Sequence, residues 1–152
     1  MTTRLAIVAT DGSEAAVAAA RAALSLLHPD LEVQLVTVVE PAYDPVQDEG
    51  GFEGPVMSEE QAEDEHRQAV AAASGALAAT AAAVEPVAHT ELVTSPERPA
   101  DALLHLAAER DAAVLVVGHE QHGILRELFA GSVSGRLVHR SPCPVLVVPH
   151  RS

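Results

Sequence analysis

The residues with the clearest chemistry lie in the last third of the chain, where glycine and serine follow an apolar run. Residues 113–117 are continuously apolar and lead into Gly118; a polar loop follows, and Gly131-Ser132-Val133-Ser134 then begins a segment with helical character. Free backbone N–H groups at the start of a helix, together with glycine turns and hydroxyl groups, bind anions. This pattern indicates a place for a phosphate or another anion.

A carboxylate follows a second apolar run. Residues 5–9 are apolar and are followed by Thr10-Asp11-Gly12-Ser13. Asp11 stands where open α/β sheets meet their ligands, at the carboxyl end of a strand. Asp11 or Ser13 can instead cap the next helix, with Glu14 three residues after Asp11 as in a capping box. Both roles of Asp11 remain open at this point.

The overall charge excludes several classes of partner. The net charge is −13, from 22 acidic and 9 basic residues, and every basic residue is arginine. Nucleic acids and anionic membranes are bound by neutralising phosphates, which so acidic a surface opposes. An anionic ligand must therefore be met locally, by N–H groups, hydroxyls, a metal ion or an arginine such as Arg126. Pairing of Arg126 with Glu127 or Glu120 in solvent is the simpler role.

Composition predicts one cytoplasmic domain over residues 1–152 with a core of small aliphatic side chains. The chain is 48% hydrophobic but only 2% aromatic. No apolar run approaches the roughly 20 residues of a membrane helix, and the N-terminus lacks the features of a signal peptide. Cys143 is the single cysteine, so no internal disulfide can form, in keeping with a reducing compartment.

Strand-like and helix-like segments alternate along the chain. Strands are expected at residues 5–9, 32–39, 86–93, 113–117 and 144–148, and helices before His28 and at 58–83, 99–110 and 132–139. Ala69, Ala73, Leu77 and Val84 would form the buried face of the second helix. This alternation predicts an α/β fold with an open five-stranded parallel sheet and helices on both faces. Residues 40–57, rich in proline, glycine and acidic residues, are expected to be a surface loop.

The order of the strands decides which segments meet. An order of 3-2-1-4-5 would put the first and fourth strand ends side by side, so that Asp11 faces the loop after Gly118 across a crevice. Pro144, at the start of the last strand, suits an edge position because proline lacks an N–H donor.

These segments, in this order and spacing, resemble the universal stress protein family over nearly the whole chain. The matching pieces are residues 6–13, 99–103, 116–118, 131–134 and 142–148. The resemblance implies a Rossmann-like domain, usually a homodimer that pairs through its last strand, here 144–148, and in one subgroup an ATP site. By the same resemblance, Asp11 would face the ribose or a nucleotide-bound Mg²⁺ ion, Val39 the adenine and Gly118 the phosphates.

The loop after Gly118 supplies the rest of the implied site. The candidate contacts are Asp11, Val39, Val117, Gly118, Gly123, Gly131, Ser132, Val133 and Ser134, of which Gly131, Ser132 and Ser134 would donate N–H and O–H groups to phosphates. Each position also has a structural alternative, as a helix cap for Asp11 and Ser132 and as core for Val39.

The chain departs from the pattern of the ATP-binding subgroup at one glycine. That pattern is Gly-x-x-Gly followed after nine residues by Gly-Ser or Gly-Thr, and the second glycine is here Gln121. Glycine adopts a positive φ at little cost and lets the backbone approach phosphates, whereas glutamine does so at a cost. Gly123 can supply the permissive position if the loop shifts, while Glu120 adds a negative charge near the phosphates. Glu97 likewise replaces a glycine that the family usually has before the third helix.

Other chemistries are poorly supported. His119, Glu120 and His122 lack the i, i+4 helical spacing of a zinc site, so a solvated loop is the simpler interpretation. A Walker P-loop needs lysine, and neither a Gly-x-Gly-x-x-Gly nor a Gly-x-Ser-x-Gly motif is present.

The function predicted from the sequence is that of a stress-response or signalling protein that binds adenine nucleotide, ATP with or without Mg²⁺, at the carboxyl ends of the first and fourth strands. Two alternatives remain. One is a dimeric interaction protein of the same fold that binds no nucleotide, favoured by Gln121 and Glu120. The other is a weak ATPase that relies on Asp11 and Mg²⁺, and any such hydrolysis would be slow because no base or lysine clamp can be named.

Overall fold

A computed structural model of the chain describes residues 3–41, 58–85, 87, 89–119 and 137–149. Its elements are β1 (Arg4–Ala9), α1 (Glu14–Leu26), β2 (Leu31–Val39), α2 (Glu59–Ala83), β3 (His89–Thr94), α3 (Pro99–Glu109), β4 (Val114–His119) and β5 (Val145–Pro149). The five strands form one parallel sheet in the order β3-β2-β1-β4-β5. The predicted fold class and strand order are therefore confirmed.

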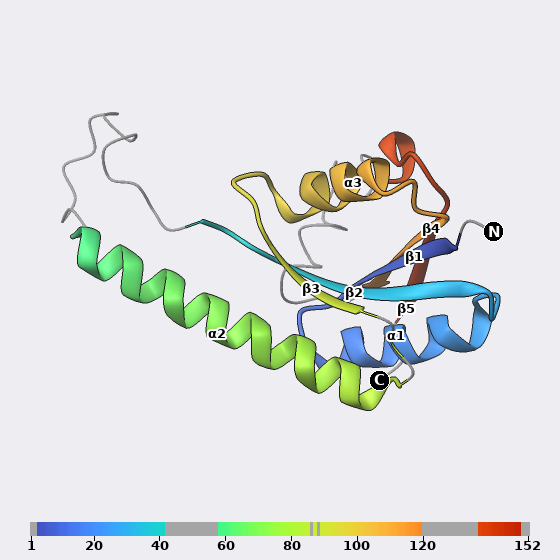
Figure 1. The fold of residues 1–152 in the computed structure, drawn as a ribbon, viewed down its shortest axis with the longest axis horizontal. Helices are drawn as coiled ribbons and strands as arrows, with labels where there is room; N and C mark the ends of the chain where they lie inside the picture. Colours follow the sequence, from blue (N-terminus) through green and yellow to red (C-terminus); the bar gives the residue numbers. More distant parts are fainter. Residues whose placement is uncertain (1–2, 42–57, 86, 88, 120–136, 150–152) are drawn as a thin grey trace.

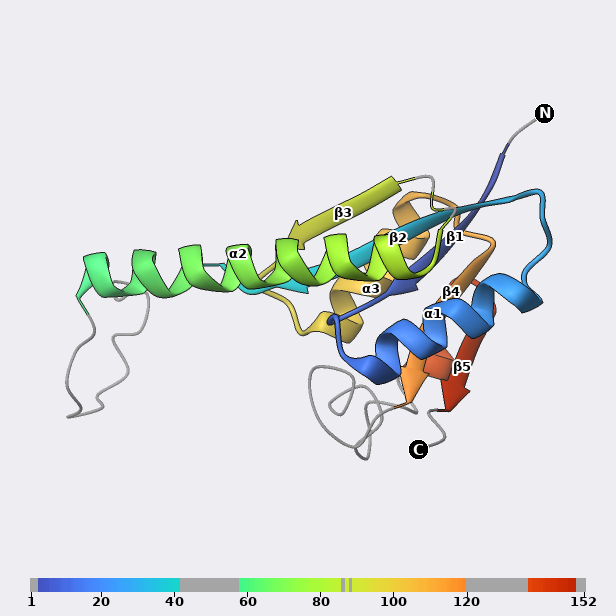
Figure 2. The same ribbon diagram turned by 90° about the horizontal axis from the view of Figure 1, so that it is seen from below.

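Helices cover both faces of the sheet. Figures 1 and 2 show α3 on one face and α1 and α2 on the other. Successive side chains of β1 point to opposite faces, so Ile7 packs in the cluster under α3 and Val8 in the cluster under α1 and α2. Burial on both faces explains why the middle of β1 and most of β4 are apolar instead of alternating, whereas β2, also an inner strand, carries the buried polar residues Gln34 and Thr37.

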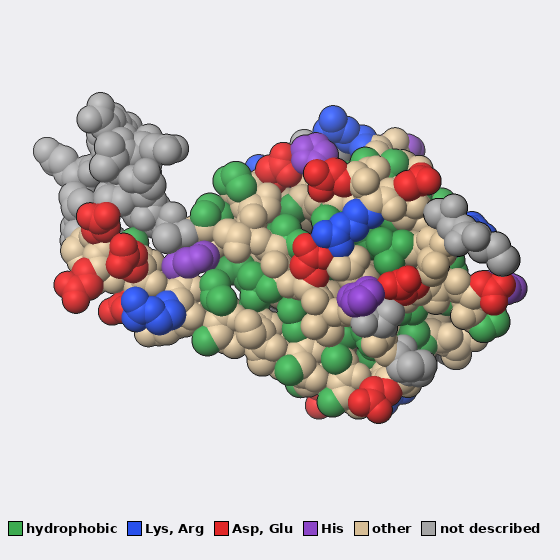
Figure 3. Space-filling model, in the orientation of Figure 1, with side chains coloured by type: hydrophobic (Ala, Val, Ile, Leu, Met, Phe, Trp, Pro, Cys, Tyr) green, Lys and Arg blue, Asp and Glu red, His purple; other side chains and the backbone are tan. Residues whose placement is uncertain are grey.

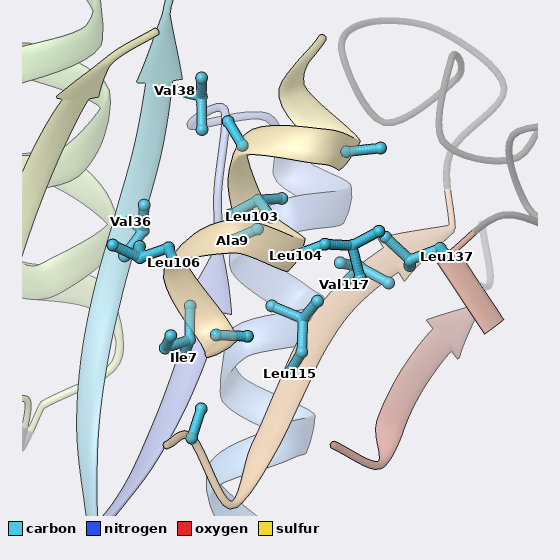
Figure 4. Close-up of a cluster of buried hydrophobic side chains, with 14 of the residues drawn as sticks. Ile7, Ala9, Val36, Val38, Leu103, Leu104, Leu106, Leu115, Val117 and Leu137 are labelled. Carbon is cyan, nitrogen blue, oxygen red and sulfur yellow. The ribbon is translucent and has the colours of Figure 1, made fainter. Parts of the chain in front are cut away.

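The cluster under α3 joins that helix to β1, β2 and β4. Figure 4 shows Leu103, Leu104 and Leu106 of α3 against Ile7 and Leu115 of the sheet. Leu137, in the helical residues 137–140, is fully buried in the same cluster. The start of the helix expected at 132–139 lies outside the described residues, as do residues 42–57 of the expected surface loop.

Helix α2 extends well beyond the sheet at its N-terminal end (Figure 1). It begins with a capping box, in which Ser58 Oγ accepts the Gln61 N–H and Gln61 Oε1 accepts the Ser58 N–H. Figure 3 shows acidic side chains gathered over the protruding end, where Glu59, Glu60, Glu63, Asp64 and Glu65 are exposed. The other half of the helix packs on β2 and β3 through Ala73, Leu77, Thr80 and Val84.

Some local predictions were wrong. The described third strand is His89–Thr94 and pairs with β2 from Gln34 onward, whereas the expected strand began at residue 86; residues 86 and 88 lie outside the described residues. The last strand runs from Val145 to Pro149, one residue later than predicted. Ala69, placed on the buried face of α2, is exposed.

Of the two caps predicted for the first helix, Asp11 and Ser13, the structure confirms Ser13 and shows no capping box of Asp11 with Glu14. Ser13 is the N-cap residue and its Oγ accepts the Ala16 N–H, so Glu14 is the first helical residue. None of the helices in the described part of the chain is both long and apolar enough to span a lipid bilayer.

Candidate functional site

The loop that follows β1 is held by its own side chains. Asp11 Oδ1 accepts the Ser13 N–H at 3.0 Å, and Thr10 Oγ1 accepts the Gly12 N–H at 3.1 Å. Gly12 has a φ of +78°, a conformation that favours glycine. Asp11 is thus fixed by a local turn, while Ser13 does the capping of α1, so the Asp11 carboxylate keeps acceptor capacity for a ligand.

A pocket of about 500 Å³ opens beside this loop. Its walls come from the carboxyl end of β2, from one face of α2 and from the start of α3. The lining residues are Asp11, Thr37, Val38, Val39, Glu40, Ala69, Ala72, Ala73, Ala76 and Pro99. The structure therefore brings Asp11 and Val39, two residues singled out from the sequence, into one cavity.

The pocket joins small apolar walls to a few oxygen acceptors. Four alanines of α2 and Val38 and Val39 supply the apolar surface, and among the described lining residues the charged groups are the carboxylates Asp11 and Glu40. Such a site suits a flat, mostly uncharged group with N–H or O–H donors at its rim, because carboxylates accept hydrogen bonds and attract no anion.

The fourth strand ends beside the first, as the strand order requires. The last paired residues of β1 and β4 are Val8 and Val116, so Gly118 lies two residues beyond that pair, at the edge where Thr10 also lies. Val117 is fully buried in the cluster under α3, and Gly118 is buried too. Neither lines the pocket described above.

The remaining candidates lie outside the described residues: Gly123, Gly131, Ser132, Val133 and Ser134, together with Gln121 and Glu120. Among the described residues, no group of three His, Cys, Asp or Glu side chains is arranged to hold a metal ion.

Sequence reasoning missed most of the pocket wall. Thr37, Glu40 and the alanines of α2 carried no recognisable motif. A partial signal existed, because Ala69, Ala72, Ala73 and Ala76 recur at the three- and four-residue spacing of one helical face. Nothing in the sequence said that this face would lie across from Asp11.

A second hollow, of about 490 Å³, lies on α3 and the segment after residue 137. Its lining has mixed charge, with Glu97 and His105 paired at 2.8 Å and Arg140 nearby. It includes none of the residues predicted to bind a ligand.

An ion pair of a different kind ties α3 to the sheet. Glu91 of β3 meets Arg110 through two contacts, Nη1–Oε2 at 2.5 Å and Nη2–Oε1 at 2.8 Å, and Gln34 bonds to both side chains. Hydrogen bonding from Arg110 holds the pKa of Glu91 below its ordinary value, although burial opposes the shift. None of these three residues lines the pocket, so we assign the group a structural role.

Comparison with known proteins identifies similar sequences. Residues 3–149 match the model of the universal stress protein family. A universal stress protein of Thermus aquaticus is 43% identical over 51 residues, which cover 34% of this chain and 37% of that protein. A second, from Bacillus subtilis, is 35% identical over 66 residues, or 43% of this chain and 45% of that protein. Each match thus spans less than half of the relative's length.

Solved structures match over almost the whole chain. A universal stress protein in complex with cAMP is 26% identical, with a TM-score of 0.62 and 98% of both chains covered. A family member from Arabidopsis thaliana with AMP bound is 18% identical, with a TM-score of 0.62 and coverage of 98% of this chain and 93% of that one. At that identity the second match supports the fold alone.

Proposed function

Because this chain belongs to the universal stress protein family, we propose that it binds an adenine nucleotide, with the nucleoside held in the pocket between Asp11, the end of β2 and α2. The observation that carries the proposal is that Asp11 and Val39 line the same cavity. These are the two residues that the family resemblance assigns to the ribose and to the adenine.

The chemistry of the pocket fits a nucleoside. Its volume lies within the range of small-molecule sites, and the small side chains of the α2 alanines leave room for a flat ring beside the carboxyl end of β2. Asp11 and Glu40 offer acceptors for ribose hydroxyls or for the amino group of adenine. The related structure that contains cAMP, at 26% identity, supports an adenine ligand for this chain.

The phosphates would extend from the pocket toward the end of β4. We assign them to Gly118, Gly131, Ser132 and Ser134, with Val117, Gly123 and Val133 beside them. ATP is the nucleotide that the sequence pattern favours, with Mg²⁺ offsetting the negative charges of Glu120 and Asp11. Such an ion would supply charge neutralisation, and Asp11 would orient it or the ribose.

Calorimetric titration tests the proposal. The wild type is titrated with cAMP and with ATP and Mg²⁺, and the same titrations are run with cGMP and GTP and on Gln121→Gly. We expect saturable heat with the adenine ligands, weaker heat with the guanine ligands, and tighter ATP binding in Gln121→Gly. Absence of heat with every adenine ligand in the wild type would reject the proposal and favour an interaction protein that binds no nucleotide.

The proposal includes a homodimer that pairs through β5. Within the described sheet β5 has one neighbour, β4, so its other edge leaves backbone groups unpaired, and Val147 is 37% exposed. Light scattering should give a molar mass twice that of the single chain, and Val147→Glu should lower the measured mass toward that of a monomer. A monomer at all accessible concentrations would exclude this pairing.

A further inference from the structure

Three hydroxyl groups link the loop between β1 and α1 (residues 10–13, the Asp11 loop) to α2 and β2. Thr10 Oγ1 lies 3.0 Å from Thr80 Oγ1 in α2, and Thr37 Oγ1 in β2 donates to the Thr10 carbonyl oxygen at 2.7 Å. All three threonines are buried, Thr80 with 0% of its surface exposed and Thr10 with 4%. Thr10 and Thr80 are 70 residues apart in sequence, so this contact joins the loop after β1 to α2.

The donors and acceptors of this group have one consistent arrangement. Thr80 Oγ1 donates to the Ala76 carbonyl oxygen at 2.8 Å, and Thr10 Oγ1 accepts the Gly12 N–H. A hydroxyl has one proton, so Thr80 must accept from Thr10. The result is a single series of hydrogen bonds that runs from the Gly12 N–H through the Thr10 and Thr80 hydroxyls to the Ala76 carbonyl oxygen.

One end of this series of hydrogen bonds lies in the pocket wall, and the other end lies next to a lining residue. Ala76 lines the α2 wall, and Gly12 is the residue next to Asp11. Figure 2 shows the connection from β1 to α1 running beside α2. Thr80 itself does not line the pocket, so any effect of Thr80 on a ligand must pass through Thr10 and Ala76.

We propose that Thr80 is a positioning residue of the nucleotide pocket, whose hydroxyl sets the distance between the Asp11 loop and the α2 wall. Removing the hydroxyl leaves the Thr10 O–H buried without its acceptor, which is costly in a dry site. Thr10 can then rotate away, and the Gly12 N–H loses its partner. The inference about ligand affinity rests on the proposed function, whereas the effect on Gly12 does not.

Three variants separate positioning from general stability. Thr80→Val keeps the shape but removes the hydroxyl, and Thr80→Ser keeps the hydroxyl but removes the methyl group. Val33→Ala removes buried surface near the start of β2, away from the pocket lining, and serves as a control for lowered stability. Thr80→Ala takes the place of Thr80→Val if the latter does not fold.

Two measurements are made on each variant: the affinity for cAMP by calorimetry, and the hydrogen exchange rate of the Gly12 amide by NMR. We expect Thr80→Val to lower the affinity for cAMP about tenfold and to speed hydrogen exchange of the Gly12 amide more than Val33→Ala does. Thr80→Ser should remain close to the wild type in both measurements. Equal affinity and equal Gly12 exchange in Thr80→Val and the wild type would overturn the inference. The inference would also be overturned if Thr80→Val lost no more cAMP affinity and no more protection of the Gly12 amide than an equally destabilised Val33→Ala.

The outcomes also distinguish this inference from the proposed function. If the wild type binds no adenine nucleotide, the proposed function fails, and exchange at Gly12 alone decides the role of Thr80. Faster exchange in Thr80→Val than in Thr80→Ser would then support positioning, and equal rates would contradict it.

Discussion

Gly12 lies directly against Ala76, so closely that a Cβ atom placed on Gly12 would be 2.5 Å from the Ala76 Cβ. The two residues belong to the Asp11 loop and to α2, and both of these segments contribute lining residues to the candidate pocket. The absence of a side chain at Gly12 thus lets α2 approach the loop, and the positive φ at the same residue adds a second need for glycine.

Replacing Gly12 with alanine should lower the free energy of unfolding by about 2–4 kcal/mol, because both the positive φ and the contact with Ala76 oppose a methyl group. Chemical denaturation of the two proteins measures the change.

Gly75 provides the matched control for this substitution. It lies in α2 with nothing within 4 Å of its added Cβ, so Gly75→Ala should raise stability by about 0.5–1 kcal/mol through helix propensity. Equal effects of the two substitutions would show that the packing of α2 on the loop has been misjudged.

Ala72→Leu should block the ligand without harming the fold. Ala72 lines the pocket and is exposed, whereas its neighbour Ala71 is exposed but does not line it. Leucine has nearly the helix propensity of alanine, so both variants should unfold within about 0.5 kcal/mol of the wild type. Calorimetry with cAMP should show that binding is lost in Ala72→Leu and retained in Ala71→Leu. Binding retained in both variants would show that the ligand does not occupy this pocket.

Asp11→Asn should lower the affinity for the nucleotide about fivefold, because a neutral amide oxygen accepts a hydrogen bond from the ribose less strongly than a carboxylate does. The loop should keep its shape, because the asparagine side chain can still accept the Ser13 N–H. Asp64→Asn makes the same change in net charge at the exposed, protruding end of α2 and should leave affinity unchanged. Identical affinities for the nucleotide in Asp11→Asn and Asp64→Asn would show that Asp11 does not contact the ligand.

Glu91→Gln should lower stability at pH 7 by about 1–2 kcal/mol, since it breaks a two-point ion pair with Arg110 that is screened by solvent, each side chain being 32% exposed. The pair of Asp64 with Arg67 is more exposed, so Asp64→Asn should cost about 0.5 kcal/mol or less. Urea denaturation compares the two.

The effect of Glu91 should depend on pH. Its folded-state pKa is lowered from the ordinary 4.5, so its contribution is fully present above that value and is lost as the pH falls through the lower, folded-state pKa. Wild type and Glu91→Gln should therefore differ at pH 7 and converge as the pH is lowered below 4.5. A difference that stays constant with pH would exclude a role for the Glu91 charge.

The sequence predicted β1 and β4 well because both strands lie inside the sheet, are buried on both faces and therefore appear as unbroken apolar runs, as at residues 5–9. The third strand was less clear because β3 is an edge strand with exposed His89 and Thr90, which gives a weaker pattern. Asp11 could be singled out because strand ends are where α/β sheets bind ligands, and Val39 was singled out by the resemblance to the family.

The rest of the site depends on how distant segments meet. Alanines such as Ala72 carry no reactive group, and only the position of α2 across from Asp11 makes them a pocket wall. The contact of Thr10 with Thr80 depends on the same packing. No local pattern predicts such contacts between distant residues.

An NMR titration of the wild type with cAMP tests the central claim most directly, since it reports both binding and location. Saturable shifts of the backbone amides of Asp11, Gly12, Val39 and Glu40, with those of His105 and Arg140 at the second hollow unchanged, are the predicted result. Shifts confined to the second hollow, or no shifts at saturating cAMP and ATP, would contradict nucleotide binding in the pocket between Asp11 and α2.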